Sequence, residues 1–229
     1  MYDAVFISYN EPDADERYKR LLERYPNTKS LHGVKGIHQA HIEAAKKCYT
    51  KMFWVIDGDA DLLPEFNLDH KVNEYDLDCV HVWRSRNPIN DLVYGYGGVK
   101  LFPTAPLKNA TDWNIDFTTS VGGSNKFRPM PAVSNTTRFN TDPFNTWKSA
   151  FRECTKLASA IIPNHDNTDN LYRLKVWQER GEKRDYGKYA IMGAKQGAEF
   201  GEHYKNDIDI LNRINDFKWL KDTYEQQAT

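Results

Sequence analysis

The first sixty residues switch between two spacings of apolar positions, which predicts strands and helices in turn. A short apolar run at residues 4–9 has the length of a strand. Residues 18–25 then place apolar side chains at i, i+3, i+4 and i+7, the spacing of an amphipathic helix, which ends at Pro26. A second helical spacing over residues 37–48 leads directly into the apolar run at residues 52–56. This order of strand, helix and strand predicts a parallel sheet with right-handed crossovers.

The middle of the chain adds two strands before the pattern becomes helical. Residues 78–83 and 98–102 have the length and the apolar content of strands. Residues 103–141 are rich in Gly, Pro, Ser, Thr and Asn, so they predict loops and short strands. Asp142 followed by Pro143 predicts the N-cap and the first position of a helix.

A later helical segment carries a glycine at every fourth position: Gly193, Gly197 and Gly201. Lys195 and Glu199 lie between these glycines, so the segment does not belong in a membrane. The spacing predicts close packing against a neighbouring helix. The C-terminal residues after this segment predict further amphipathic helix with a break near Asn215.

The stretch MFWVIDGDADLL is unusual because an apolar run ends in three carboxylates at every second position, Asp57, Asp59 and Asp61. These positions match the first three ligands of an EF-hand calcium loop. The match fails because Leu62 replaces the glycine that the sharp turn needs, and Leu68 replaces the bidentate glutamate.

Two interpretations of this acidic stretch remain open. In one, a buried strand leaves the core into a solvated acidic loop. In the other, a divalent cation is bound at the carboxyl end of a buried strand, where open α/β sheets place their ligands. Mg²⁺ and Mn²⁺ bind to one or two carboxylates together with phosphate oxygens, so a cation carrying a diphosphate would relieve the repulsion.

Composition is that of an ordinary globular protein without a global charge. Of 229 residues, 40% are hydrophobic and 28% are charged, and the formal net charge is −1. Nucleic acid would therefore need a local basic face. The three cysteines are an odd number without close spacing, and no signal-length or membrane-length apolar segment occurs. We expect a cytoplasmic protein with reduced thiols.

Several motifs of common enzyme classes are absent. There is no GxxxxGK[ST] phosphate loop, no HExxH, no CxxC pair and no GxSxG. The GYGG at residues 95–98 precedes a predicted strand instead of opening a helix, so it is not a dinucleotide-binding fingerprint.

The remaining features, in their order, resemble the nucleotide-sugar-dependent glycosyltransferases of the GT-A fold. The resemblance is carried by VFISYNE, GVKGIHQAHIEAA and above all FWVIDGDADLL. It implies an α/β fold with a GT-A-like (Rossmann-like), mostly parallel central sheet flanked by helices, and a helical C-terminal part. We expect one domain over residues 1–229. Residues 1–102 would bind the nucleotide sugar, and residues 103–229 would bind the acceptor and form the C-terminal helices.

Later segments are similar to a phage-borne branch of this fold that glycosylates hypermodified DNA bases and is related to the base J glucosyltransferases. These segments are NPINDLVYGYGGVKLFPT, DPFNTWKSAFRECTKLAS, and GAKQGAEFG with INDFKWL. The resemblance implies transfer of a hexose or pentose from a UDP-sugar to 5-hydroxymethylcytosine or 5-hydroxymethyluracil in phage DNA, in the host cytoplasm. A divalent metal, Mn²⁺ or Mg²⁺, is the implied cofactor.

The resemblance also assigns residues to the donor site. Asp59 is the expected metal ligand, and Asp57 is expected to bind the ribose or a metal-bound water. Asp61 and His203 are further metal candidates, although a solvated loop and an exposed helix end also explain them. His41 lies on an apolar helix face and is expected in the core. The other nucleotide-sugar-binding candidates, which a turn or an exposed surface could also explain, are Ser8, Tyr9, Asn10, Glu11, Lys35, His38 and Gly58.

Asp142 and Glu153 are the candidates for the base that takes the proton of the acceptor hydroxyl. Asp142 already has a sufficient role as a helix N-cap. Glu153 lies roughly 120° from the centre of the apolar face of its helix, where it can reach a cleft or solvent. For the acceptor, basic residues interleaved with aromatics suit phosphates and an extruded base, although solvated charge explains each one alone. These candidates are Arg84, Arg86, Tyr94, Tyr96, Lys100, Arg128 and Arg138.

Three other functions stay open from the sequence. A transferase of the same fold could act on a protein or a glycan. A nucleotidyltransferase could use the same acidic strand end for a triphosphate, although no glycine-rich loop follows the first strand. A DNA-binding or partner-binding module would need a continuous basic face, which the near-neutral balance disfavours.

Overall fold

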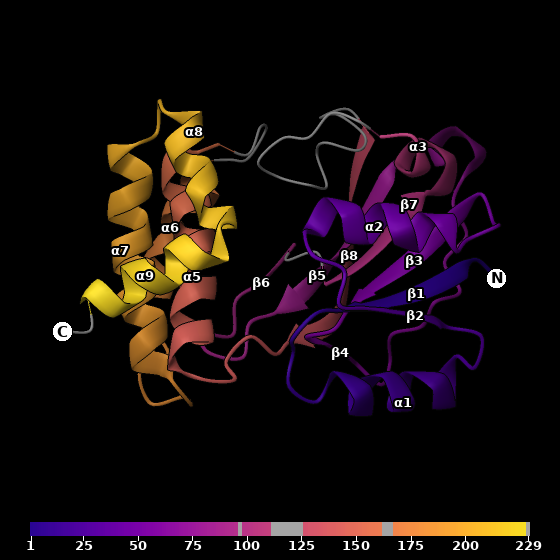
Figure 1. The fold of residues 1–229 in the computed structure, drawn as a ribbon, viewed down its shortest axis with the longest axis horizontal. Coiled ribbons are helices and arrows are strands. Elements are labelled where there is room, and N and C mark those ends of the chain that lie inside the picture. The colour runs from indigo at the N-terminus through magenta and orange to yellow at the C-terminus, as the bar shows by residue number, and fades with distance from the viewer. Residues whose placement is uncertain (96–97, 111–125, 162–166, 228–229) are drawn as a thin grey trace. The chain divides into compact units, whose positions relative to one another are not determined.

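The computed structural model describes residues 1–95, 98–110, 126–161 and 167–227 (Figure 1). The chain forms two compact units, each made from two pieces of sequence. The first comprises Met1–Arg86 and Val93–Arg138, and the second comprises Asn87–Leu92 and Phe139–Thr229. The expected division at residue 102 therefore falls inside the first unit, because residues 127–137 return to its sheet.

The first unit is built around one mixed sheet. Its described strands are β1 (Asp3–Ser8), β2 (Lys29–His32), β3 (Met52–Asp57), β4 (Ala60–Leu62), β5 (Val80–Arg86), β6 (Val93–Tyr94), β7 (Val99–Pro103) and β8 (Phe127–Thr137). They lie in the order β2-β1-β3-β7-β5-β8-β4, with β6 paired to β5. The α/β class is confirmed.

The sequence predicted a mostly parallel sheet, but the observed sheet is mixed. β1 is parallel to β2 and to β3, and β5 is parallel to β8. However, β7 lies between β3 and β5 and runs antiparallel to both, and β4 and β6 also pair in antiparallel fashion. The expectation was wrong because the spacing of apolar residues predicts that a segment is a strand, but not whether it runs parallel or antiparallel to its neighbours.

Helices cover the two faces of this sheet: α1 (Ala14–Arg24), α2 (Ile37–Lys46) and α3 (Thr104–Lys108), with the short 3₁₀ helix η1 (Glu74–Asp76) before β5. Leu21 of α1 packs with Ile56 on one face. Ala45 of α2 and Leu107 of α3 pack with Val55 on the other. Successive side chains of β3 point to opposite faces, so its apolar run contributes to both layers. Figure 1 shows α1 and α2 on opposite sides of the sheet.

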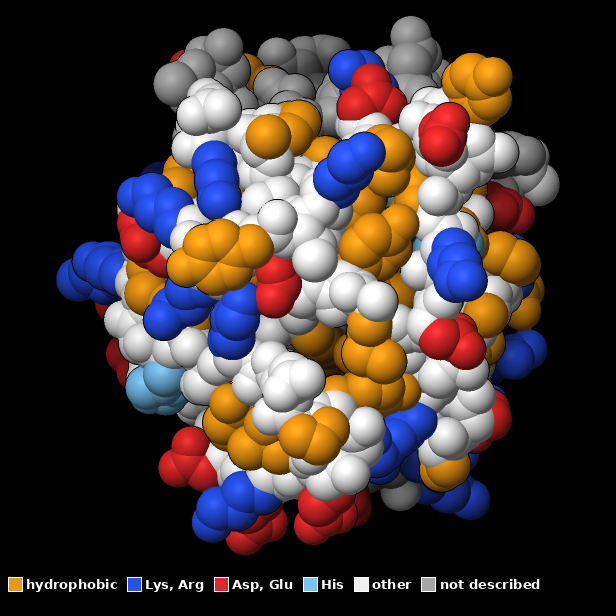
Figure 2. All heavy atoms as spheres, turned by 90° about the vertical axis from the view of Figure 1, so that its right-hand side faces the viewer, with side chains coloured by type: hydrophobic (Ala, Val, Ile, Leu, Met, Phe, Trp, Pro, Cys, Tyr) orange, Lys and Arg blue, Asp and Glu red, His pale blue; other side chains and the backbone are white. Residues whose placement is uncertain are grey.

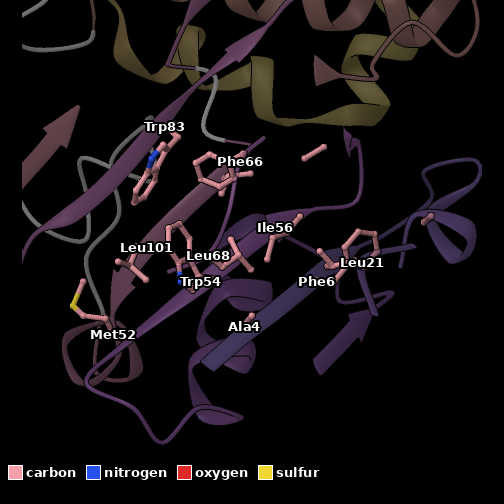
Figure 3. Close-up of a cluster of buried hydrophobic side chains, with 13 residues drawn as sticks. Ala4, Phe6, Leu21, Met52, Trp54, Ile56, Phe66, Leu68, Trp83 and Leu101 are labelled. Atoms are coloured by element: carbon pink, nitrogen blue, oxygen red, sulfur yellow. The ribbon is translucent and has the colours of Figure 1, made fainter. Parts of the chain in front are cut away.

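An aromatic cluster on the α1 face ties β3 to β5 (Figure 3). The ring centroids of Trp54 and Trp83 lie 4.6 Å apart, and Phe66 packs edge-on against both at 6.2 and 5.9 Å. All three side chains are buried. Truncating a buried aromatic of this kind to alanine typically costs about 3–5 kcal/mol. The strand that carries the acidic stretch is thus firmly anchored in the core.

The second unit is helical: α5 (Pro143–Ser159), α6 (Asn167–Glu179), α7 (Gly187–His203), α8 (Ile208–Leu211), η3 (Asn212–Asn215) and α9 (Phe217–Gln227). The predicted N-cap is confirmed, because the Asp142 side chain accepts a hydrogen bond from the backbone N of Asn145. The predicted break is also confirmed, since η3 ends at Asn215 before α9 begins. None of the helices in the described ranges is long and apolar enough to cross a membrane.

The glycine repeat of α7 packs directly on the backbone of α5. A Cβ added at Gly193, Gly197 or Gly201 would lie 2.3, 2.2 or 2.5 Å from the carbonyl oxygen of Trp147, Phe151 or Thr155, respectively. The residue numbers of the contact partners increase together along α7 and α5, so the two helices run parallel. The prediction of close helix packing at these glycines is confirmed.

Four of the described strands, β2, β4, β6 and β8, lie where the sequence predicted none or only short pieces. β2 is a four-residue edge strand whose residues alternate between half-buried and exposed. β8 is eleven residues long and contains Pro129 and Pro131. Its other edge pairs with β4 only at residues 135–137, so within the described chain Pro129 and Pro131 lie where one edge of the strand is unpaired, the usual place for proline in a strand.

Candidate functional site

The candidate site lies at the carboxyl ends of β1 and β3, which are adjacent parallel strands. Ile7 pairs with Asp57 in the register, so the loops after both strands leave the sheet at the same edge. Asp57 ends β3, Asp59 follows two residues later, and Glu11 lies in the loop after β1. The three carboxylates are close enough to influence one another electrostatically. We call Glu11, Asp57 and Asp59 the acidic cluster.

Gly58 lets the two loops approach each other. A Cβ at this position would lie 2.8 Å from Cβ of Ser8 and 3.0 Å from Oε2 of Glu11. The Glu11 carboxylate is oriented by a hydrogen bond of 2.6 Å from the backbone N of Tyr9. The fold therefore brings together Ser8, Glu11 and Gly58, which the sequence assigned to one site.

A buried lysine belongs to the same cluster. Lys100 lies on β7, opposite Val55 of β3, and its side chain is only 5% exposed. Its Nζ donates to both carboxylate oxygens of Asp57, at 3.1 and 2.8 Å. Lys100 was expected among the acceptor-binding residues. Its burial and its contact with Asp57 place it beside the acidic cluster.

The cluster holds more negative charge than its surroundings offset. The pKa of Asp59 is raised to about 7, first by burial and then by the carboxylates of Asp57 and Glu11, while Lys100 and Arg17 oppose this shift. Burial also raises the pKa of Asp57, against the opposing effect of Lys100. Both carboxylates are partly buried, and a further cation would stabilise their charged forms.

The donor set fits a hard divalent cation that brings some of its own ligands. Both oxygens of Asp57 accept from Lys100. Across the described residues, no group donates a hydrogen bond to the Asp59 carboxylate, and no set of three His, Cys, Asp or Glu side chains is arranged to hold a metal. Mg²⁺ keeps several waters and binds through one or two carboxylates plus substrate phosphates. Asp59 therefore suits a cation shared with a diphosphate.

Arg17 of α1 supports the turn that carries the cluster. Its Nη1 donates to the carbonyl oxygens of Pro12 at 2.8 Å and Gly58 at 3.3 Å, so it links the two loops. The same arginine lines a pocket of about 320 Å³ between α1 and the β3–β4 segment, together with apolar residues such as Phe6 and Ile56. Arg17 was not among the residues singled out from the sequence.

Asp61, a candidate metal ligand, is engaged elsewhere. It forms ion pairs with Arg20 at 3.5 Å and with Arg138 at 3.3 Å. The backbone N of Arg138 also donates to the carbonyl oxygen of Asp59 at 2.7 Å. These contacts link the β3–β4 turn to α1 and to the end of β8, and they occupy the Asp61 carboxylate.

The other donor-site candidates surround the ends of β1 and β2. Ser8 Oγ lies 2.9 Å from His32 Nδ1, whereas Tyr9, Asn10 and Lys35 are exposed, as a ligand-contacting loop requires. His38 is half-buried, and burial lowers its pKa. His41 is buried, and its Nδ1 lies 2.8 Å from the carbonyl oxygen of Ile37, consistent with the core role expected for it.

The acceptor candidates on β5 and β6 differ in exposure. Arg84 and Arg86 are two residues apart on β5 and both are exposed, so they share one face of the strand. Tyr94 on β6 is 6% exposed, which leaves little of its ring for stacking against a base. Tyr96 lies outside the described residues.

The two acceptor candidates near β8 are paired with carboxylates. Arg128 forms an ion pair with Asp76 at 2.8 Å, and Arg138 contacts Asp61 at 3.3 Å. Both arginines are partly exposed, at 40% and 45% of their side-chain surface. They can reach a phosphate only in competition with these partners.

The second unit contains the remaining candidates. Asp142 caps α5 and also accepts from Nδ2 of Asn145 at 2.5 Å, so its carboxylate is occupied. Glu153 is half-buried on the same helix. His203 is exposed at the end of α7, and its ring packs edge-on against Tyr204 at 4.4 Å. Roles for Glu153 and His203 stay predictions.

Comparisons with known proteins assign no family. No family model matches the chain, and no curated protein sequence matches it. Among solved structures, HddC from Yersinia pseudotuberculosis aligns with 59% of this chain and 91% of its own, with 13% identity and a TM-score of 0.36. A likeness this weak bears on neither the fold family nor the function.

Proposed function

We propose that the protein is a metal-dependent glycosyltransferase of the GT-A type. It moves a sugar from a nucleoside-diphosphate sugar, a UDP-sugar being the expected donor, to a hydroxymethylated pyrimidine in DNA. The observation that carries the proposal is the acidic cluster at the carboxyl ends of two adjacent parallel strands, with an exposed loop beside it. This is where open α/β sheets bind ligands.

The residues around the cluster suit each part of a nucleotide sugar. The exposed Tyr9 and Asn10 are available to the base, and Glu11 is held beside them by the Tyr9 backbone. Asp57, fixed by Lys100, can accept from a ribose hydroxyl. Asp59 would hold the divalent cation, which would supply positive charge for the leaving diphosphate.

The transfer itself needs one new bond and one proton acceptor. The hydroxymethyl oxygen attacks the anomeric carbon, the bond from that carbon to the diphosphate oxygen breaks, and the hydroxyl proton passes to a base. Because the Asp142 carboxylate already accepts three hydrogen bonds at the start of α5, Glu153 is the less occupied of the two candidates for this base in an inverting reaction.

The DNA acceptor rests on the resemblance of the later segments. The exposed Arg84 and Arg86 on β5 support it, because cations at neighbouring positions of one strand face can hold a phosphate backbone. The ion pairs of Arg128 and Arg138 weaken their part in this surface. We therefore expect Arg84→Ala with Arg86→Ala to reduce DNA binding more than Arg128→Ala.

The direct test is mass spectrometry of nucleosides from hydroxymethylcytosine DNA incubated with enzyme, Mn²⁺ and a panel of UDP-sugars. We expect a hexose or pentose adduct, release of UDP, and activity that falls as salt rises. An adduct on a protein or glycan instead would overturn the DNA acceptor. Release of pyrophosphate from a nucleoside triphosphate would identify a nucleotidyltransferase. Salt-dependent DNA binding without any donor hydrolysis would identify a binding module.

A further inference from the structure

Lys100 is a charged residue in the middle of the sheet. Its neighbours Val99, Leu101 and Phe102 are fully buried, and β7 is flanked by β3 and β5. A lysine is almost never fully buried unless it is paired. Here the partner is Asp57, whose side chain is 31% exposed at the end of β3. The ammonium group of Lys100 therefore extends from the middle of the sheet and contacts the acidic cluster at Asp57.

This contact changes what the two aspartates of the D-x-D can do. The ammonium lies 2.8 and 3.1 Å from the two oxygens of Asp57, so it neutralises that carboxylate. A divalent cation bound to the same oxygens would lie next to the ammonium and be repelled by it. Asp59 has no such partner among the described residues. The two carboxylates are thus unequal, although the sequence presents them alike.

We propose that Lys100 is a positioning residue that holds Asp57 and keeps it from binding metal, so that Asp59 alone takes the divalent cation and retains it only together with a diphosphate. The identity of the diphosphate rests on the proposed function, whereas the inequality of the two aspartates rests on the contact alone. Metal and nucleotide would then bind as one unit, and the free protein would be nearly metal-free.

A second ion pair in the same sheet provides a matched control. Lys29 donates to Asp3 at 2.7 Å, at the opposite end of β1 from the acidic cluster. Figure 2 views the molecule from the side where β1 begins, and it shows Lys and Arg side chains interspersed with Asp and Glu. The backbone N of Tyr49 and of Thr50 also donates to Asp3, so this carboxylate is saturated. Lys29→Met also removes a lysine from a carboxylate of this sheet, without touching the cluster, although Lys29 is more exposed than Lys100, at 32% against 5%.

The test measures free Mn²⁺ by electron paramagnetic resonance during titration of wild type, Lys100→Met, Lys29→Met and the double variant Lys100→Met with Asp57→Asn. In wild type we expect UDP to tighten Mn²⁺ binding at least tenfold. Lys100→Met should bind Mn²⁺ without UDP at least tenfold more tightly than wild type, because Asp57 becomes available. The double variant should return to within threefold of wild type, and Lys29→Met should match wild type.

A second comparison does not require the lysine variant to fold. With Lys100 in place, Asp57→Asn loses the ribose contact and should weaken UDP binding, but Mn²⁺ should still bind once UDP is saturating. Asp59→Asn should abolish the UDP-dependent binding of Mn²⁺ even at saturating UDP. Equal losses in the two variants, or unchanged or weaker Mn²⁺ binding in Lys100→Met, would overturn the proposal. If Lys100→Met tightens Mn²⁺ binding but UDP has no effect on any variant, the role of Lys100 stands and the nucleotide donor is wrong.

Discussion

Gly197 of α7 lies against Phe151 of α5 so closely that an added Cβ would come within 2.2 Å of the Phe151 carbonyl oxygen. The obstacle is backbone, so no side-chain rotation can relieve the clash and the helices must separate. We expect Gly197→Ala to destabilise the protein by about 2–3 kcal/mol, although alanine favours the isolated helix by about 1 kcal/mol. Urea unfolding followed by circular dichroism measures the effect.

The matched control for this substitution is Lys195→Ala, at an exposed position of the same helix. It should change the free energy of unfolding by no more than about 0.5 kcal/mol. A Gly197→Ala variant as stable as this control would mean that α5 and α7 are not in backbone contact.

A second prediction concerns acid stability and Asp3. Burial alone would raise the pKa of Asp3, but hydrogen bonds from Lys29 and from the backbone of Tyr49 and Thr50 outweigh it and lower the pKa to about 2. Because the folded pKa lies below the unfolded value, ionised Asp3 stabilises the fold above about pH 4, and this contribution is lost as pH falls from 4 toward 2.

Asp3→Asn should therefore lower the free energy of unfolding at pH 7 by up to about 2 kcal/mol. The difference between variant and wild type should shrink steadily between pH 4 and pH 2. Thermal unfolding at a series of pH values measures it. A difference that stays constant across this range would show that the effect comes from lost packing and not from the charge.

A third prediction concerns Gly58 in the D-x-D. Alanine there would place its Cβ 2.8 Å from Ser8 Cβ and 3.0 Å from the Glu11 carboxylate, so the loops after β1 and β3 must move apart. We expect a loss of stability of about 1–3 kcal/mol, the usual cost of overpacking, and at least tenfold weaker binding of UDP with Mn²⁺. Calorimetry measures the binding.

Gly95→Ala is the control for the Gly58 substitution, because a Cβ at Gly95 would meet nothing within 4 Å. It should bind UDP and Mn²⁺ as wild type does. If Gly58→Ala is destabilised but binds UDP normally, the close approach of the two loops is structural and the donor lies elsewhere.

Much of the first unit follows from local pattern. The apolar run of β3 ends in polar residues that predict a site at the sheet edge. β1 and β3 are parallel neighbours, as the alternation of strand and helix predicted, although α1, β2 and α2 all lie between them in the chain. β7 was placed correctly along the chain, but nothing in its own residues says that it inserts between β3 and β5 in the opposite direction. β8 was missed because it contains two prolines. Proline is tolerated in a strand only beside an unpaired edge, and the sequence does not show that β8 has one.

The site itself was predicted only in part, because pairing between distant residues is invisible to local pattern. Asp57 and Lys100 are 43 residues apart, and only the β3–β7 register brings them together. One signal was available, since a lysine inside an apolar run that fits a buried strand must find a counterion. Asp61 likewise resembles its neighbours in sequence, but Arg20 and Arg138 hold it.

We expect the acidic cluster to bind a nucleoside diphosphate together with a divalent cation at Asp59. The most direct measurement is thermal unfolding with UDP, with and without Mn²⁺, in wild type, Asp59→Asn and Asp61→Asn. UDP with Mn²⁺ at 100 times its dissociation constant should stabilise wild type by about 2.7 kcal/mol. The same shift should appear in Asp61→Asn, whose carboxylate pairs with arginines, and vanish in Asp59→Asn or without Mn²⁺. No stabilisation of wild type, or an equal one in Asp59→Asn, would contradict the claim.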